Sequence, residues 1–182
     1  MRLREATDVK HRLAEGMPFN MLMFEGKLTI EQYTEYLKVQ YNIFHEIESK
    51  VVLPNDFIRA GKIFSDIVEL VCKYEDKNAQ PLSIDTSSDI SAEYCKHLSS
   101  LSEESIWPHI YLNYLALLYG GQMMKKIPGS GKMFDFENSH DIIKTIRNKQ
   151  LDDWADEVNV GYDYIIEIFE KLHKKTIDVQ FS

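Results

Sequence analysis

The segment IWPHIYLNYLALLY, residues 106–119, is apolar on nearly every side of the helix that it predicts. A helix that is apolar all round is buried on most sides, so the rest of the chain has to pack around it. In the remaining sequence, apolar residues recur every three or four positions, and no sustained alternation bounded by turn residues predicts a strand. The sequence therefore predicts an all-α fold.

The length of 182 residues favours one domain, and we expect it to span residues 1–182. The composition is 44% hydrophobic and 27% charged, with only 8 Gly and 5 Pro, which excludes a disordered or low-complexity protein. Two cysteines cannot form a disulfide framework, which fits a reducing compartment. No stretch approaches the ~20 apolar residues that span a bilayer, so we expect a soluble, cytoplasmic protein without a membrane anchor.

Breakers and caps divide the chain into helices. The first runs over residues 2–15 and buries Leu3, Ala6, Val9 and Leu13, with Pro18 as a breaker beyond it. Further helices are expected over residues 29–52, 56–74, 91–98, 102–127, 140–152 and 154–175, separated by a connection at 75–88 and a loop at 128–139. Thr29 and Ser102 are the predicted N-caps, with Glu103 and Glu104 in the first turn after Ser102.

The net charge of −8 argues against a nucleic-acid partner, because neutralising phosphates needs surplus Lys and Arg. The charge is uneven, however. Residues 1–12 and 122–150 together carry +5, which leaves −13 elsewhere. Their basic residues are Arg2, Arg4, Lys10, Arg12, Lys125, Lys126, Lys132, Lys144, Arg147 and Lys149.

Gly120 and Gly121 interrupt the most apolar helix, although each glycine costs a helix interior roughly 1 kcal/mol relative to alanine. Two explanations fit equally well at this point. A flat ligand pressed against bare backbone would require residues without a Cβ. Alternatively, the helix ends at Tyr119 and a glycine is its C-cap.

His11 lies on the shoulder of the first helix, together with Thr7, Ala14 and Glu15. A histidine there is usually a partly exposed surface residue. Glu15, however, is four residues on, where a carboxylate can accept one imidazole N–H and leave the other nitrogen for a metal. Arg4 is ~10 Å back along nearly the same face, at a distance that suits the edge of a planar ligand. The remaining histidines (His45, His97, His109, His140 and His173) give weaker signals, and all but His109 are expected at the surface.

Other chemistries lack their motifs. The sequence has no zinc-spaced His/Cys cluster, no paired ExxH motif for a di-iron centre, no phosphate loop and no GxSxG. GSGK at 129–132 lacks the phosphate-loop spacing and a preceding strand, so we interpret it as a turn.

Two segments, at opposite ends of one domain, resemble the heme oxygenase family. LREATDVKHRLAE, residues 3–15, resembles its proximal helix, and IYLNYLALLYGGQMMKKI, residues 110–127, resembles its distal helix with the GGQ segment. The resemblance continues through FNMLMFEGKLTIEQYTEYL and YIIEIFEKL, in the right order along most of the chain.

The resemblance implies heme b sandwiched between the first helix and a kinked distal helix. His11 would ligate the iron, Glu15 would support it, and Gly120 and Gly121 would let the distal backbone lie close to the ring. Arg4, Tyr111 and Arg147, with Lys144 or Lys149 as competitors, would hold the propionates, and Tyr162 and Phe169 would make apolar contacts. Heme would be both cofactor and substrate, cleaved with dioxygen and external electrons to biliverdin, carbon monoxide and ferrous iron, with a ferredoxin or another reductase as donor.

The sequence departs from the family at its distal polar residues. Ala116 and Leu117 stand where the family usually has Gly-Asp, Asn113 where many members have Arg, and Phe44 where many have Tyr. Either distal water is held by Asn113 and backbone carbonyls, or the protein binds heme without degrading it efficiently. We expect retained activity. The alternatives are a heme carrier on the same fold and a helical interaction domain without cofactor.

Overall fold

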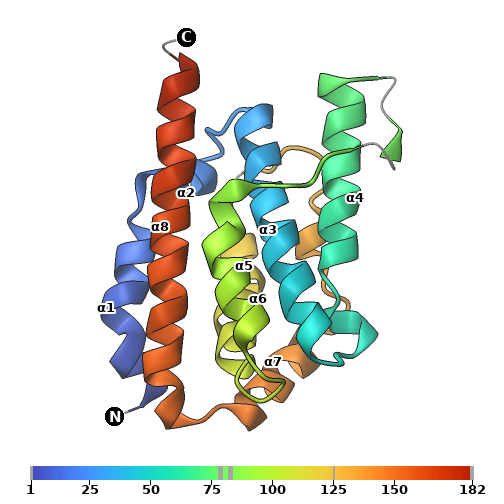
Figure 1. Ribbon diagram of the computed structural model, residues 1–182. Helices are drawn as coiled ribbons and strands as arrows, with labels where there is room; N and C mark the ends of the chain where they lie inside the picture. The colour runs from blue at the N-terminus through green and yellow to red at the C-terminus, as the bar shows by residue number, and fades with distance from the viewer. Residues whose placement is uncertain (1, 78–79, 82–83, 125, 181–182) are drawn as a thin grey trace.

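The computed structural model describes residues 2–77, 80–81, 84–124 and 126–180, and every regular element in these ranges is helical (Figure 1). The all-α prediction is therefore confirmed. The α-helices are α1 (Leu3–Glu15), α2 (Pro18–Phe24), α3 (Ile30–Lys50), α4 (Ala60–Leu70), α5 (Ala92–Ser100), α6 (Trp107–Gly120), α7 (Ser139–Lys149) and α8 (Ala155–Gln180). Lys125, which belongs to the second basic segment, lies outside the described residues.

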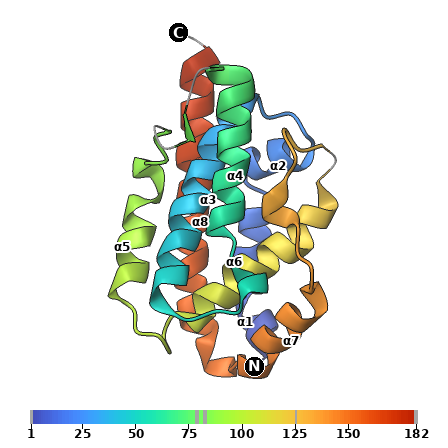
Figure 2. The same cartoon turned by 90° about the vertical axis from the view of Figure 1, so that its right-hand side faces the viewer.

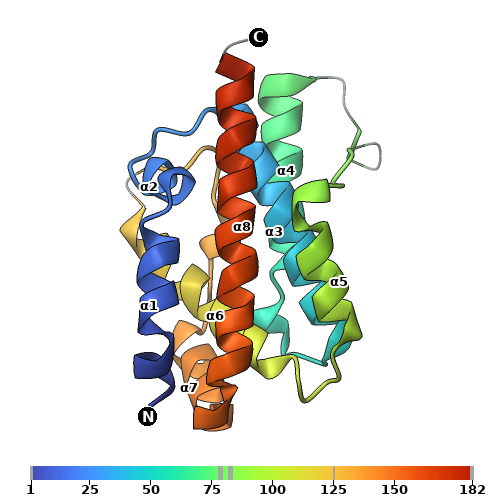
Figure 3. The same ribbon diagram turned by 60° about the vertical axis from the view of Figure 1, so that its left-hand side comes forward.

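The C-terminal helix α8 runs the length of the molecule and packs against α1, α2, α3 and α6 (Figures 1 and 3). Helix α3 packs on α4 and α5, and α6 also contacts α7. In Figure 2, α3, α4 and α8 run roughly parallel, while α6 crosses at an angle. Ten of the 14 residues of α6 are buried, which confirms the prediction that this helix is covered on most sides.

Helix α3 begins directly after Thr29, its predicted N-cap. The Thr29 hydroxyl accepts a hydrogen bond from the backbone N–H of Gln32 at 3.3 Å, and the Gln32 side chain accepts one from the Thr29 N–H at 2.9 Å. This reciprocal arrangement satisfies two N–H groups that would otherwise lack partners. Apolar residues that recur at helical spacing along α3 are buried, namely Tyr33, Leu37, Phe44 and Ile47, and Val51 just after the helix is buried too.

The buried face of α1 differs from the one predicted. Val9 is 81% exposed and Leu13 is 54% exposed, whereas Leu3, Thr7 and Ala14 are buried. The helix is thus rotated by roughly a quarter turn from the expected orientation. The small residues Thr7 and Ala14 allow α1 to pack closely, and the Thr7 hydroxyl donates to the Leu3 carbonyl at 3.0 Å. The rotation brings His11 beside the buried face.

Two predicted boundaries are wrong, and one short helix was not predicted. The first helix ends at Glu15, before Pro18, as expected, but Pro18 then opens α2 at its first turn, where the missing N–H costs nothing. Ser102 caps a turn, accepting from the Ser105 N–H at 3.2 Å, and α6 begins only at Trp107 and ends at Gly120. The helix expected at 56–74 is divided into a 3-10 turn (Asn55–Phe57), α4 and a π-helical turn (Val71–Glu75).

The break before α4 belongs to a buried polar centre. Glu48 accepts from the backbone N–H of Arg59 at 2.6 Å and from the Tyr114 hydroxyl at 3.1 Å. Arg59 is 1% exposed, donates to the Phe57 and Asp135 carbonyls, and stacks 4.0 Å from the Phe136 ring centroid. The centre therefore fastens the loop at 128–139 to α3 and α4.

The same loop contains the predicted turn. GSGK forms an irregular turn with Gly129 and Gly131 in the left-handed region, at φ 74° and 65°. Buried Asp66 of α4 accepts from the backbone N–H groups of Lys132 and Met133, each at 2.8 Å. These bonds fix the position of the next residue, Phe134.

Candidate functional site

A cavity of about 710 Å³ lies between α1, α6 and α8, a size typical of small-molecule and cofactor sites. Helices α2 and α3 also contribute to its wall, together with Phe134 from the loop and Arg147 from α7. The cavity brings together all but one of the predicted site residues. Those that line it are Arg4, His11, Glu15, Tyr111, Asn113, Gly120, Gly121, Arg147, Tyr162 and Phe169.

On the α1 side, His11 and Glu15 are placed as their spacing predicts. His11 Nε2 lies 3.4 Å from a Glu15 carboxylate oxygen, and 49% of the His11 side chain is exposed. The ring meets Tyr162 of α8 edge to face, with centroids 6.0 Å apart. The carboxylate can thus hold one imidazole nitrogen while Nδ1, which has no hydrogen bond to a described residue, is open to a ligand.

On the α6 side, the wall ends at Gly120 and Gly121. The helix does end here, but neither glycine has a positive φ, so no left-handed C-cap requires a glycine. A Cβ on Gly121 would lie 3.0 Å from Cγ of Phe134 and closer to its ring edge, whereas one on Gly120 would meet Phe24 at an ordinary 3.8 Å. Gly121 is therefore explained by close packing, and its missing side chain points to Phe134 rather than into open space.

Asn113 lines the cavity, but both hydrogens of its amide are engaged. They are donated to the Tyr94 hydroxyl and to the His109 carbonyl, each at 2.9 Å. Tyr94 in turn contacts His109 Nδ1 at 2.9 Å. Burial lowers the pKa of His109 from its usual value, although Glu157 opposes this shift. Asn113 therefore has only its carbonyl oxygen to offer to the cavity.

Sequence reasoning missed His109. It is completely buried, whereas its place in the first turn of α6 gave no clear signal. His97, expected at the surface, is only partly exposed and shares a carboxylate with His109. The two histidines come from the consecutive helices α5 and α6, but the carboxylate that joins them comes from α8, so no local pattern could reveal the cluster.

The three other departures from the family pattern have different surroundings. Leu117 is 6% exposed and, like Ala116, lines the cavity. Phe44 does not line it but packs edge to face on Tyr114, with centroids 5.0 Å apart. The apolar replacement at Leu117 is thus the one that changes the cavity wall most directly.

Two guanidinium groups lie at the cavity without a carboxylate partner among the described residues. Arg4 has no ion pair there, and Arg147 contacts Gln150 at 2.7 Å and lies 5.3 Å from the Tyr111 ring centroid. Arg12, by contrast, is paired with Asp8 at 2.9 Å. Lys144 is the one predicted site residue that does not line the cavity. Lys149 does not line it either, and its ammonium group lies over the Trp107 ring. Among the three basic candidates on α7, the geometry favours Arg147.

Further lining residues come from α2 and α3. Tyr36, Gln40 and Ile43 of α3 face the cavity, and Phe24 closes it near the glycines. The i, i+4, i+7 spacing of the three α3 residues shows that they share one face of that helix, but the sequence alone does not reveal that this face lines the cavity.

On α8, burial raises the pKa of Tyr162 above its usual value, so its hydroxyl stays neutral.

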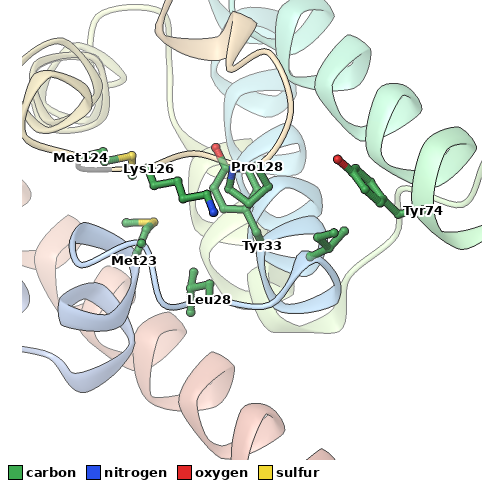
Figure 4. A pocket seen from close by; sticks show the side chains of 9 residues that line it. Met23, Leu28, Tyr33, Tyr74, Met124, Lys126 and Pro128 are labelled. Carbon is green, nitrogen blue, oxygen red and sulfur yellow. The ribbon is translucent and has the colours of Figure 1, made fainter.

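A second, smaller cavity of about 210 Å³ lies beside α2 and the start of α3 (Figure 4). Met23, Leu28, Tyr33, Met124 and Lys126 are among its lining residues. Its lining has no histidine, cysteine or carboxylate, so we assign it no chemistry.

The whole architecture matches solved helical structures. The crystal structure of heme oxygenase-1 from the cyanobacterium Synechocystis in complex with heme superposes with a TM-score of 0.76 at 19% identity, covering 97% of this chain and 93% of that one. Heme oxygenase from Leptospira interrogans gives a TM-score of 0.69 at 21% identity, covering 93% and 97%. The protein thus has the all-α fold of these structures.

Sequence comparisons identify the family. The family model for heme oxygenase matches residues 1–150, most of the chain. The heme oxygenases of Porphyra purpurea and Guillardia theta are 23% and 21% identical, covering 97% and 98% of this chain and 87% and 88% of theirs. The chain belongs to the heme oxygenase family. None of the helices among the described residues is long and apolar enough to cross a membrane.

The two glycines should respond differently to alanine. Gly121→Ala should lower the free energy of unfolding of the heme-free protein by about 1–3 kcal/mol, because the Phe134 ring must move. Gly120→Ala, the matched control, should leave it unchanged or raise it by up to about 1 kcal/mol through helix propensity. Urea unfolding followed by circular dichroism measures both. Equal effects of the two substitutions would contradict this packing.

Proposed function

We propose that this chain is an active heme oxygenase that binds one heme between α1 and α6 and, with dioxygen and external electrons, converts it to biliverdin, carbon monoxide and ferrous iron. One observation carries the proposal. A single cavity has a carboxylate-supported histidine on one wall, a glycine pair on another, and two guanidinium groups without carboxylate partners.

The residues present fit heme. A cavity of about 710 Å³ with apolar side chains from α6 and α8 suits a flat macrocycle, and the two guanidinium groups of Arg4 and Arg147 suit its two propionates. Tyr111 lies beside Arg147 and would add a hydroxyl at the same edge. Tyr162 and Phe169 would pack on the ring from α8.

Each wall would have its own task. When bound, heme supplies both the iron at which dioxygen is reduced and the carbon that is oxidised. His11 would bind the iron from the α1 side, with Glu15 holding the second ring nitrogen and so fixing the tautomer. Gly120 would let backbone lie close to the opposite face, while Gly121 would let Phe134 pack into the same wall. Arg4 and Arg147 would fix the rotation of the ring and thereby the edge that is attacked.

The polar groups of the α3 and α6 walls would hold distal water. Because both Asn113 amide hydrogens are engaged, its carbonyl oxygen could accept from distal water but not donate to it. Gln40 and the Tyr36 hydroxyl are further polar groups in the cavity wall. We propose that these groups, with backbone carbonyls near Gly120, hold water in place of the missing carboxylate.

We propose an acidic electron donor and a cytoplasmic location. Arg4, Arg12 and Arg147 line the cavity and come from the two basic segments, and we propose that they give its mouth a positive rim for an acidic donor such as a ferredoxin. A cytoplasmic location would place the protein with such donors.

A non-catalytic heme carrier is the second candidate, and Leu117 is the observation that favours it. Single-turnover biliverdin formation by the wild type and Leu117→Asp separates the two. We expect an active wild type and an equal or slower Leu117→Asp variant, because the change puts a charge into a buried apolar site. Leu117→Asn is the control for shape without charge. An inactive wild type that Leu117→Asp activates would establish the carrier instead.

His11→Ala tests the iron ligand. The variant should still bind hemin in the apolar cavity, but its turnover should fall at least about tenfold, equivalent to ~1.4 kcal/mol of barrier. Added imidazole should restore part of the activity and of the wild-type absorption spectrum. His140→Ala, at an exposed histidine on α7, should leave both unchanged. Wild-type turnover by His11→Ala would refute the assignment.

Arg147→Ala tests the propionate anchor. Loss of a charge-assisted hydrogen bond should weaken hemin binding by about 1–3 kcal/mol and mix the biliverdin isomers, because the ring can rotate. Lys149→Ala is the matched control, since its ammonium group lies over Trp107 and outside the cavity. Hemin titration and chromatography of the product measure the two effects. An unchanged affinity and a single unchanged isomer in Arg147→Ala would move the role to Lys144 or Lys149.

A further inference from the structure

A compact group of ligating side chains lies outside the lining of the large cavity. His97 of α5, His109 of α6 and Glu157 of α8 each offer one ligand atom, and the three atoms lie within 4.8 Å of one another. His97 Nε2 is 2.7 Å and His109 Nε2 is 2.8 Å from the same Glu157 oxygen. Both imidazoles therefore point at one carboxylate, from different helices.

The cluster is partly shielded but reachable. The His109 side chain is fully buried, while 22% of His97 and 33% of Glu157 are exposed. An ion could therefore reach the cluster from the side on which His97 and Glu157 are exposed to solvent. Two imidazoles and one carboxylate are also the protein ligands of known three-ligand zinc sites.

The surroundings hold these ligands in place. The Tyr94 hydroxyl lies 2.9 Å from His109 Nδ1, the nitrogen that faces away from Glu157. Such a partner on the second nitrogen orients metal-binding histidines and fixes their tautomer. Gly161, one turn after Glu157, lets α8 approach α6, because a Cβ there would lie 3.1 Å from His109 Nδ1 and 2.5 Å from Leu112.

We propose that His97, His109 and Glu157 form a binding site for a divalent transition metal of the zinc type, which ties α5, α6 and α8 together. The present 2.7 and 2.8 Å contacts are hydrogen bonds. A metal ion would replace these bonds after the ligand atoms move a few tenths of an ångström apart. Each imidazole would stay neutral by carrying its proton on Nδ1, and Tyr94 would accept that proton's hydrogen bond from His109.

The three proposed ligands are separate from the proposed heme ligand. None of them lines the large cavity, and His11 is on α1. Tyr94 connects His109 to Asn113 of the cavity wall, but it ligates neither the metal nor the heme. Metal binding here can therefore fail while heme turnover succeeds, or the reverse.

Zinc titration of the full-length protein, with and without bound hemin, tests the proposal. We expect one Zn²⁺ per chain at this site and a zinc-dependent rise in the melting temperature, since a ligand that binds only the folded state stabilises it. His97→Ala and Glu157→Gln should each weaken zinc binding by more than about 100-fold. This exceeds the 10–100-fold loss that is typical when a residue that only hydrogen-bonds to a metal ligand is removed. Both substitutions are at partly exposed positions, so circular dichroism should show intact folds.

Two further variants distinguish a metal site from a hydrogen-bonded cluster alone. Tyr94→Phe keeps all three ligands and should weaken zinc binding by about 10–100-fold. His140→Ala removes an exposed histidine and should change nothing. The proposal would be overturned if Zn²⁺ did not bind one-to-one with a Kd below about 10 μM, which corresponds to a binding free energy of about −7 kcal/mol. Wild-type affinity in His97→Ala or Glu157→Gln would overturn it as well.

Discussion

The packing of α8 against both α1 and α6 sets the separation of the two walls between which the ligand cavity lies. On the α1 side, the Asn159 amide donates to the Ala6 carbonyl at 3.2 Å, and Lys10 reaches Asp163 and the Asn159 carbonyl. On the α6 side, Gly161 permits the close approach to Leu112 and His109. These contacts fix both helices to the same element, α8, which therefore sets the width of the cavity between them.

The glycine pair can now be given a physical explanation. Glycine at a helix end usually supplies a left-handed residue, but neither Gly120 nor Gly121 uses that freedom. Gly121 instead leaves space for Phe134, which is held by the bonds of Asp66 to the neighbouring backbone. At Gly121, close packing with Phe134 at the cavity wall therefore offsets the lower helix propensity of glycine.

Local signals made much of the fold predictable. The capping box at Thr29, the apolar stripe of α3 and the His11–Glu15 spacing each depend on residues within one or two turns. The buried face of α1 was not predictable, because apolar Val9 and Leu13 outweigh Thr7 and Ala14 on any hydropathy pattern. Close helix packing selected the smaller residues instead. The contributions of Tyr36, Gln40 and Phe134 to the cavity, and the cluster at His109, depend on contacts between distant segments and leave no local pattern.

In the proposed binding mode, heme lies between α1 and α6, with His11 on one face and its propionates at Arg4 and Arg147. A crystal structure of the full chain with hemin tests this mode most directly. We expect electron density for one heme in the 710 Å³ cavity, an iron bond from His11, and propionate contacts to both arginines. A heme bound elsewhere, or ligated by another histidine such as His97, would contradict it.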